Sequence, residues 1–538
     1  AAAAIAFITN DLSAMVTLIF PGTNGVATTL TAFTGVSRTN HTGAWNVDAD
    51  GNWSNAANWT DGVIADGTGN TADFSTVSMT ADHTVMLDTS RNIGALKFGD
   101  ASGTWNWTIT NSAGSTLTLN NSSSSPTIVV TNTATLALPV AGANGFTKSG
   151  PGTLVLSGSN SLSGTLNIDS ASTTANDGTV RIAGSASVAN MASPIYLRNN
   201  NSGSSTLQLD GTLGSVNVTQ DISLAGRNAG AISIQNLAGS NTLAGNFILS
   251  SGGGNYWFDS DNGTLNLTGM IPASAPTVPS ARTLAFFGTG NITVSGSIGN
   301  ANGFAVSLVK SNSGTLTLNG SNAYTGATTV NSGTLAGSGV IEGPVTIAPG
   351  GTLSPGSSAI GTLTINNTLT NNGTAALRLN KSGATLTNDN INGLSTFALG
   401  GTLRLVPSGS QVTAGDSFKL FSAASYRNFF TNIIPVTPGT NLLWNTNGIA
   451  VNGTLAVALG TVSPQVSGIF LAGTNLTLNG AGGAAGYGFS ILSETNLTVP
   501  FTNWSLLVTG ICDGQGNFTV TNGLSPAGQQ VFYIIRIP

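Results

Sequence analysis

The chain has 538 residues, a formal net charge of −5 at pH 7, and charged residues at only 7% of its positions. With 15 Lys and Arg residues in all, it offers no basic patch to replace the counterions of nucleic acid, so nucleic-acid binding is excluded. A hydrophobic content of 40% with so little charge also excludes intrinsic disorder. The single cysteine, Cys512, rules out a framework of internal disulfide bonds.

The first predicted element is an apolar segment over residues 1–36. Residues 5–20 read IAFITNDLSAMVTLIF, a run that is broken at Asn10 and stops at Pro21, as a pair of β-strands would be. The run is shorter than the roughly 20 apolar residues that a membrane-spanning helix needs, so we expect no membrane span. The small residues at positions 1–4 are typical of a signal-peptide cleavage site, which predicts a secreted protein, extracellular or on the cell surface.

Two roles fit this apolar segment. It either folds back as a cap on its own subunit, or it leaves its subunit and adds a strand to the next one. Strand donation of this kind is head-to-tail and does not close, so it produces fibres. In both cases the contact is expected from the large apolar side chains of the segment, which are Ile5, Phe7, Ile8, Val16, Leu18 and Phe20.

A tryptophan-rich segment follows over residues 37–110. Such side chains can form a platform on which sugars stack, or they can close the end of a hydrophobic core. We interpret the segment as an N-terminal β cap, because any stacked repeat fold needs its ends closed. The tryptophans concerned are Trp45, Trp53, Trp59, Trp105 and Trp107.

Internal repetition dominates residues 111–462. Each copy places Leu and the next-but-one apolar residue on one face of a strand, Thr or Asn on the other, and Gly at the turn. One such strand cannot bury its apolar face alone, whereas parallel stacking buries it, which predicts an all-β fold built on a parallel β-solenoid. At ~20 to 25 residues per turn the segment gives on the order of fifteen turns. The motif Gly-Thr-Leu or a close variant begins at Gly152, Gly164, Gly178, Ser205, Gly263, Gly290, Gly314, Gly333, Gly351, Gly361, Gly401 and Gly453.

The most regular copy is SGTLTLNGSNAYTGATTVNSGTL, residues 313–335. Its alternation predicts that Leu316 and Leu318 point into the core of one turn. Gly314, Gly320 and Gly326 are expected at corners, and the Thr and Asn side chains on the outer face.

These copies resemble the autotransporter-associated β-strand repeat, also called the passenger-associated transport repeat. The resemblance is carried by residues 149–168 (SGPGTLVLSGSNSLSGTLNI) and 313–341, with supporting likeness over 343–380 and over 44–62. It implies a large secreted bacterial surface β-solenoid rather than a class of enzyme. The first copy departs from the repeat pattern, since Leu162 replaces its aromatic residue and Ser163 its Thr.

The composition changes near Ser463, and residues 463–538 read as about six short alternating strands. This pattern predicts a small C-terminal antiparallel β-sandwich, which would cover the open end of the solenoid. The segment is too short and too polar for the membrane barrel of a self-exporting autotransporter, so we expect none.

No residue pattern predicts catalysis. His41 and His83 lie far apart in sequence, no motif joins either to a Ser and an Asp, and both are expected in surface turns. No CxxC, HExxH, GxSxG or P-loop spacing occurs, so we expect no cofactor and no enzymatic activity. A polysaccharide lyase would need clustered cations, whereas the basic residues of the repeats are spread singly over Arg181, Arg227, Arg282, Lys310, Arg378 and Arg404.

Two short acidic patterns are candidate calcium ligands. Asp48 and Asp50 fit the first half of a calcium-binding loop, but position twelve is Ala57 where the loop needs Glu. Asp259 and Asp261 form a similar fragment. Both patterns also suit plain Asx turns, and the two interpretations stay open.

The pattern as a whole predicts a secreted structural protein, a subunit of an extracellular filament or surface layer, and the resemblance implies a bacterial one. Low charge leaves little repulsion between copies, so the expected partner is the chain itself in a head-to-tail homopolymer. The alternative is an adhesin that binds extracellular polysaccharide through its Asn, Ser and Thr side chains. A polysaccharide-degrading β-helix enzyme is a further alternative.

Overall fold

The computed structural model describes residues 18–21, 27–30, 38–168, 178–184, 188–198, 205–227, 230–272, 280–301, 303–460, 464–483, 486–523 and 530–537. The chain forms two compact units. The first comprises residues 1–353 and 363–368, and the second comprises 354–362 and 369–538. The fold is a parallel β-solenoid of about 14 turns with a small antiparallel sheet set at the C-terminus, so the predicted fold class is confirmed.

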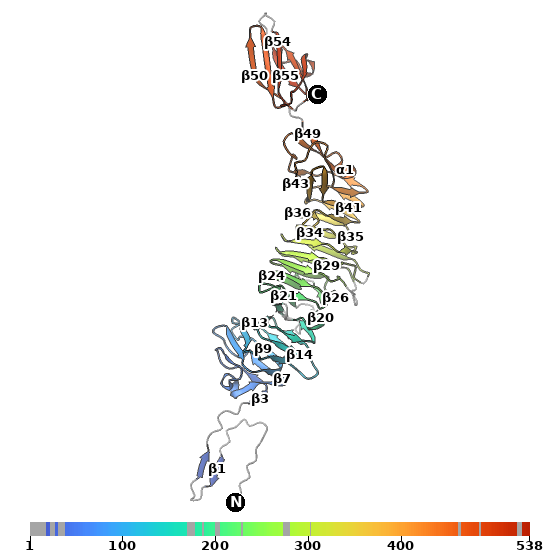
Figure 1. Ribbon diagram of the computed structural model, residues 1–538. Coiled ribbons are helices and arrows are strands. Elements are labelled where there is room, and N and C mark those ends of the chain that lie inside the picture. The colour runs from blue at the N-terminus through green and yellow to red at the C-terminus, as the bar shows by residue number, and fades with distance from the viewer. Residues whose placement is uncertain are drawn as a thin grey trace. The chain divides into compact units, whose positions relative to one another are not determined.

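One long parallel ladder runs through the first unit (Figure 1). Each strand pairs with the strand one turn later, in the register that keeps equivalent apolar residues above one another. Its strands are β5 (Gly51–Asn52), β8 (His83–Leu87), β10 (Trp107–Asn111), β13 (Thr133–Leu136), β16 (Thr153–Leu156), β19 (Thr179–Ile182), β21 (Thr206–Asp210), β24 (Ile234–Ala238), β27 (Asn255–Ser260), β29 (Arg282–Phe287), β31 (Val306–Lys310) and β34 (Thr328–Gly337).

A second ladder forms another side of the same turns. It contains β4 (Gly43–Ala44), β7 (Gly67–Phe74), β9 (Arg91–Phe98), β12 (Thr127–Val130), β15 (Phe146–Ser149), β18 (Thr165–Ile168), β20 (Ala192–Leu197), β23 (Ile222–Gly226) and β26 (Phe247–Gly252). Shorter strands extend from it at β11 (Leu117–Leu119), β14 (Val140–Gly142) and β17 (Ser161–Leu162).

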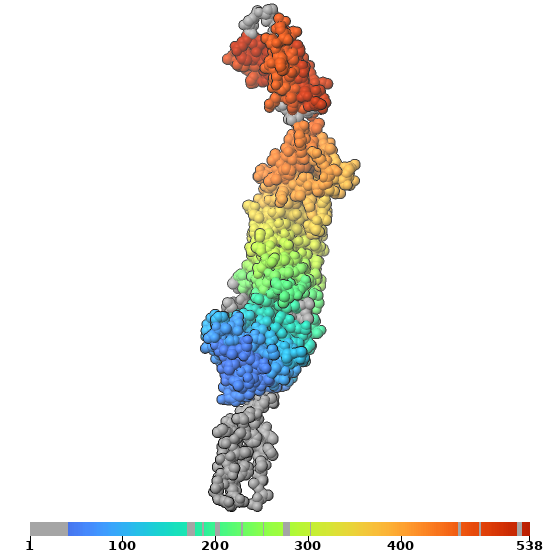
Figure 2. Space-filling model, turned by 60° about the vertical axis from the view of Figure 1, so that its left-hand side comes forward, coloured from blue at the N-terminus to red at the C-terminus, as the bar shows by residue number. Residues whose placement is uncertain are grey.

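A third ladder joins the long β34 to the turns before it. It contains β22 (Asn217–Val218), β25 (Ser240–Leu243), β28 (Thr264–Leu267), β30 (Asn291–Val294) and β32 (Thr315–Leu318). Turn length varies along it, because Ile292 lies beside Leu316, 24 residues on, whereas Leu316 lies beside Leu335, only 19 residues on. The colour bands of Figure 2 follow one another through this region without mixing, so each turn contacts its neighbours in sequence.

The repeat copy at residues 313–335 shows how the pattern works. Leu316 and Leu318 are fully buried, as predicted. Gly314 is required because a β-carbon there would lie 1.9 Å from the carbonyl oxygen of Gly290 in the preceding turn. Thr317 and Thr328 are buried, so the prediction that they lie on the outer face is wrong. The same prediction is wrong for Asn322, which is also buried. Its Oδ1 accepts from the N–H of Ile298 at 3.1 Å, and its Nδ2 donates to the carbonyl of Val340 at 3.0 Å, so it joins three successive turns.

The first residues of the chain contain a short hairpin. In it β1 (Leu18–Pro21) pairs antiparallel with β2 (Ala27–Leu30), and β1 ends at Pro21 as the sequence predicts. Leu18 and Phe20 therefore lie in β1, whereas the other predicted assembly residues, Ile5, Phe7, Ile8 and Val16, lie outside the described residues. The first turn then begins with β3 (Arg38–His41), which pairs with β6 (Val63–Ala65), and includes the 3-10 turns η1 (Ala56–Asn58) and η2 (Thr60–Gly62).

Three remaining strands pair with one another near the boundary of the two units. β33 (Ser321–Asn322) pairs with β35 (Val340–Ile341), which pairs with β37 (Thr362–Ile365). The chain passes from one unit to the other within β36 (Val345–Pro355), β37 and β38 (Thr368–Asn371).

The second unit begins with the last solenoid turns. Its parallel pairs are β39 (Thr374–Ser382) with β43 (Thr402–Gly409) and β47 (Asn432–Ile434), β42 (Thr396–Ala398) with β46 (Tyr426–Arg427), and β41 (Asn390–Leu394) with β45 (Phe421–Ala423). β40 (Thr385–Asn388) returns antiparallel to β39.

A small antiparallel sheet follows these turns. β49 (Thr454–Leu459) lies between β44 (Ser417–Lys419) and β48 (Leu442–Asn445), and the single α-helical turn among the described residues, α1 (Ile449–Asn452), contacts β45 and β46 of the last turn. The motif at Gly453 therefore differs from the other copies, because its strand β49 pairs antiparallel rather than forming a solenoid turn.

The C-terminal segment is a sandwich of two three-stranded antiparallel sheets, as predicted. One sheet contains β50 (Gln465–Ala472), β51 (Asn475–Ala481) and β54 (Phe518–Gly523). The other contains β53 (Ser505–Ile511), β52 (Gly488–Glu494) and β55 (Phe532–Arg536), with the 3-10 turn η3 (Phe501–Asn503) before β53. Their shared core is Leu476, Leu478, Phe489, Ile491, Cys512 and Phe518.

Candidate functional site

The N-terminal tryptophans fill the core of the first turns. Phe74 lies at the centre of this cluster, with ring centroids of the neighbouring aromatic side chains 5.3 to 5.7 Å away. The buried tryptophans are Trp45, Trp53, Trp59 and Trp107. Each of their indole N–H groups donates to a backbone carbonyl at 2.7 to 2.9 Å. These four side chains are therefore buried in the core of the first turns and present no open ring face for sugar stacking.

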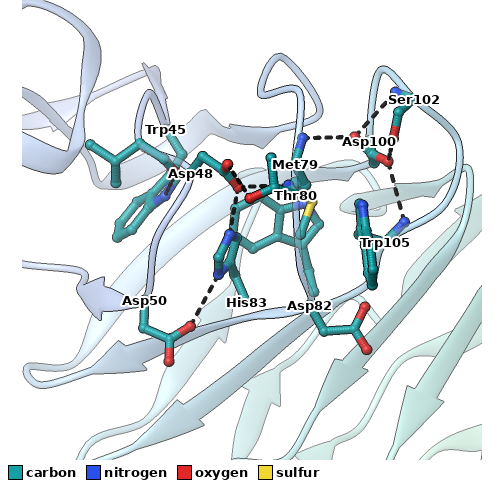
Figure 3. A network of polar contacts seen from close by, with 12 residues as sticks. Trp45, Asp48, Asp50, Met79, Thr80, Asp82, His83, Asp100, Ser102 and Trp105 are labelled. Atoms are coloured by element: carbon teal, nitrogen blue, oxygen red, sulfur yellow. Dashed lines mark hydrogen bonds and ion pairs between the residues drawn. The ribbon is translucent and has the colours of Figure 1, made fainter.

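A network of polar contacts lies beside this cluster and holds the first candidate calcium ligands (Figure 3). The backbone N–H and the hydroxyl of Thr80 donate to the two oxygens of Asp48 at 3.0 and 2.7 Å. Nε2 of His83 lies 2.6 Å from Asp48 Oδ1, and Nδ1 lies 3.3 Å from Asp50 Oδ1, which also accepts from the N–H of Thr84. Hydrogen bonds from Thr80 and His83 lower the pKa of Asp48.

The position of His83 corrects the sequence interpretation. The prediction placed it in a surface turn, but it is the first residue of β8, its side chain is 10% exposed, and its ring packs 5.9 Å from that of Trp107. Because both ring nitrogens face carboxylates, His83 ties the segment of Asp48 and Asp50 to the next turn. His41, by contrast, ends β3 and belongs to no such pair in the described part of the chain.

Asp100 anchors the loop on the other side of the same network (Figure 3). Its carboxylate accepts from the N–H groups of Met79, Thr104 and Trp105 at 2.9 to 3.2 Å and from the hydroxyl of Ser102. Burial alone would raise the pKa of Asp100, but these hydrogen bonds hold it well below its usual range. The carboxylates of Asp48, Asp50 and Asp100 thus accept hydrogen bonds from the protein's own N–H and hydroxyl groups, and these bonds hold the loops in place.

The second candidate pair lies at the end of a polar ladder on the first parallel ladder of strands. Arg181 donates to Gln208 at 3.0 Å, Gln208 to Gln235 at 2.8 Å, and Gln235 to Oδ2 of Asp261 at 2.9 Å. Asp259 lies opposite Gln235 in the register of β24 and β27. Burial, followed by the neighbouring Asp261, raises the pKa of Asp259 to about 6. Among the described residues, no group of three or more His, Cys, Asp or Glu side chains is placed to hold a metal ion.

Two lysines are buried in the solenoid, which the sequence analysis did not predict. Lys148 and Lys310 are fully buried, although isolated charged side chains are normally exposed. Nζ of Lys148 donates to the carbonyls of Gly150 and Gly152 at 2.6 Å, and Nζ of Lys310 donates to those of Ser311 and Asn312 at 2.6 and 2.9 Å. Each ammonium group thus closes the corner where its own strand ends.

A repeated sequence signal marks these lysines. Both begin the pattern Lys-Ser-x-x-Gly-Thr-Leu. Both ammonium groups lie under a glycine of the next turn, because a β-carbon on Gly178 or Gly333 would approach Lys148 or Lys310 Nζ to 2.1 or 2.8 Å. The pairing of a lysine with a glycine one turn later could have been found by aligning the copies on Gly-Thr-Leu.

Other predicted cations are also structural. Arg227 and Arg282 are buried, and Arg227 donates to the carbonyls of Ser205 and Ile232. Arg378 binds the fully buried Asp389, whereas Arg404 is exposed on β43. Arg227 and Arg378 are thus held by groups of the chain itself.

An apolar hollow lies at the end of the last solenoid turn. Its volume is about 390 Å³, and Phe429 at its rim is 76% exposed. It is lined by Phe429, Phe430, Ile433, Thr446, Asn447 and Ile449.

The stacked ladders and their lysine-closed corners define a repeat protein of the parallel β-solenoid class. The sequence model of the Passenger-associated-transport-repeat family matches residues 146–182 and 308–336, so the chain carries this repeat in two places. Each matched segment contains one buried lysine and its glycine partner. Repeat and solenoid together fit an autotransporter passenger-like surface protein, and the family suggests a secreted or surface location. No curated protein matches the chain. Within the described residues, no helix is long and apolar enough to cross a membrane.

Proposed function

We propose that the protein is a structural subunit of an extracellular filament or surface layer, assembled head-to-tail through its apolar N-terminal segment. The proposal assigns it no catalytic role. The observation that carries it is the uneven distribution of exposed apolar side chains. Of twenty exposed large hydrophobic residues in the described chain, sixteen follow residue 405. The four that precede it, Met86, Leu213, Met270 and Phe304, are scattered along the sequence.

This distribution gives the chain two different apolar ends. The last quarter exposes apolar side chains, and residues 5–20 at the start of the sequence are apolar with a single charge, at Asp11. Exposed apolar side chains that lie together, as Ile469, Phe470 and Leu471 do on β50, mark interaction sites. Because the N-terminal segment differs from the exposed side chains of the last quarter, a contact between the two joins unlike parts of two copies and does not close, which builds an open polymer.

Removal of residues 1–17 tests the proposal while leaving the hairpin of β1 and β2 in place. Sedimentation velocity of the full chain should show large, concentration-dependent assemblies, and the shortened chain should sediment as single subunits. Assemblies of equal size from both chains would exclude N-terminal donation.

An adhesin for extracellular polysaccharide is the second candidate. It is favoured by the stacked rings of Trp257 and Phe287, whose centroids lie 4.9 Å apart on neighbouring strands next to Asp259. Both side chains are half-buried, so part of the stack remains accessible. Binding of the full chain to a glycan array, lost in a Trp257→Ala variant, would support this function, and an array without signal would exclude it.

A further inference from the structure

Among the described residues, no side chain covers either face of β50, the edge strand of the C-terminal sandwich. Ile469 and Leu471 point to one side and Phe470 to the other, yet they are 64%, 65% and 59% exposed. The adjacent strand β51 shows the normal pattern instead, with Leu476 and Leu478 buried on one side. A strand in a sheet that packs on a core normally buries one of its faces. β50 differs, because the side chains on both of its faces are exposed.

The register of β50 with β51 shows which face of β50 lacks a covering sheet. Ile469 lies opposite Leu478, and Leu471 opposite Leu476, so both exposed side chains continue the buried side of β51. The second sheet covers this side at β51 and leaves it open at β50. The apolar core therefore extends past the edge of the sandwich by one strand.

The other edge of β50 is open to strand addition. In the described part of the chain β50 pairs with β51 alone, and after an irregularity between Val466 and Gly468 the register is regular over residues 468–472. The sheet of β50, β51 and β54 contains no charged residue, and charges are the usual protection of an exposed edge. An extended peptide that paired here would gain backbone hydrogen bonds and apolar contacts together.

The N-terminal segment supplies a strand of matching chemistry. Residues 4–9 read AIAFIT, in which Ile5 and Phe7 fall on one face of an extended strand. The segment before β1 has 17 residues and reaches roughly 56 Å at about 3.3 Å per residue, more than enough to pair along β50. Its single charge, Asp11, lies outside residues 4–9.

We infer that β50 is the acceptor strand of the assembly, and that residues 4–9 of a second copy add to its free edge and cover Ile469 and Leu471. This inference rests on the proposed head-to-tail assembly and names its acceptor. The hollow at Phe429 and an isologous pairing of two β50 strands are the competing contacts.

Cross-linking between two variants of the full chain tests the inference. One carries Ile8→Cys, the other Phe470→Cys, and a short bismaleimide is added to each alone and to their mixture. The native Cys512 is buried, so the unmodified chain is the blank. The matched control replaces Phe470→Cys with Leu506→Cys, because Leu506 on β53 is equally exposed at 59% but belongs to the other sheet.

The expected result is a dimer band in the mixture of Ile8→Cys and Phe470→Cys, at least tenfold stronger than in the Leu506→Cys mixture. A dimer of Phe470→Cys alone at equal strength would show isologous pairing and overturn the inference. An Ile469→Lys/Leu471→Lys variant should reduce the sedimenting fraction at least tenfold, and Phe429→Lys should leave it unchanged.

Electron micrographs of the same samples separate the two claims. Filaments without the cross-link between positions 8 and 470 would refute β50 as the acceptor and leave head-to-tail assembly standing. Samples without filaments would refute both.

Discussion

Lys310 and Gly333 occupy one corner of two successive solenoid turns. Gly333 has a φ of +74°, and the buried ammonium group of Lys310 lies beneath it, held by two carbonyls of its own turn. The same arrangement joins Lys148 and Gly178, where φ is +77°. A buried lysine packed under a glycine of the next turn thus recurs in the two matched repeat segments.

Replacing Gly333→Ala should destabilise the solenoid by at least about 1 kcal/mol. The new β-carbon would need a positive φ and would lie 2.2 Å from the carbonyl oxygen of Asn312. Chemical denaturation measures the free energy of unfolding. Gly299→Ala is the control, because a β-carbon there meets no atom within 4 Å. Equal stability of the two variants would contradict the corner geometry.

The buried Lys310 should make stability depend on alkaline pH. Burial lowers its pKa to about 8, whereas lysine in an unfolded chain titrates near about 10.4. Between these values the unfolded state binds a proton that the folded state lacks, so the free energy of unfolding rises with pH, by up to about 1.4 kcal/mol per unit. Below pH 8 both states are protonated and this dependence disappears.

A Lys310→Met variant lacks this dependence. The difference in unfolding free energy between the native chain and the variant should therefore grow from pH 8 to pH 10. Calorimetry at pH 7, 8.5 and 10 measures it, and subtraction cancels the other titrating groups. If the two chains have parallel pH profiles of stability, burial does not lower the pKa of Lys310.

Asp259, which lies beside Asp261, should make the stability of the fold change with pH in the opposite direction, in the acid range. The folded state raises the pKa of Asp259 to about 6, so it holds a proton between pH 3.8 and 6 that the unfolded state has lost. Stability therefore falls as the pH rises through this window. Asp259→Asn should be more stable than the native chain at pH 7.5, and the advantage should shrink at pH 5.

The same variant tests the calcium candidate at Asp259 and Asp261. A bound cation would remove the repulsion, so calcium would raise the unfolding midpoint of the native chain and not that of Asp259→Asn. Thermal scans with calcium and with a chelator compare the two. Equal midpoints in both solutions would leave the pair as an uncompensated acidic contact.

The ion pair of Arg378 and Asp389 should be the most costly to break. Asp389 is fully buried, and its oxygens lie 2.8 and 3.0 Å from Nε and Nη2 of Arg378. Loss of one partner leaves the other charge unpaired, so Asp389→Asn should cost about 3 to 5 kcal/mol. Lys97→Met is the control: Lys97 is 47% exposed and lies 3.3 Å from Asp73, and such surface pairs contribute ~0 to 1 kcal/mol. Urea titration of both variants measures the two losses of unfolding free energy, and equal losses would contradict the prediction.

The sequence predicted the solenoid because each Gly-Thr-Leu copy carries its own two-residue alternation. Leu316 and Leu318 could be assigned from that pattern alone. Asn322 could not, because its burial depends on an N–H and a carbonyl that two other turns leave unpaired. Burial of Lys310 depends in the same way on corner carbonyls that come together only once the turn is folded, and the sequence marks its position only through the shared pattern Lys-Ser-x-x-Gly-Thr-Leu.

The candidate sites were harder to predict than the fold. Asp48 and Asp50 were noticed for their spacing, but the residue that engages both, His83, lies more than thirty positions away and was assigned to the surface. The exposed faces of β50 also carry no sequence signal, because IFLA reads like any buried strand. Only the register with β51 shows that its core side is uncovered.

Electron microscopy of the purified full chain tests the central claim of head-to-tail assembly most directly. If assembly is head-to-tail, open filaments form, their length grows with protein concentration, and they are absent when residues 1–17 are removed. Single particles or closed dimers at every concentration would contradict it.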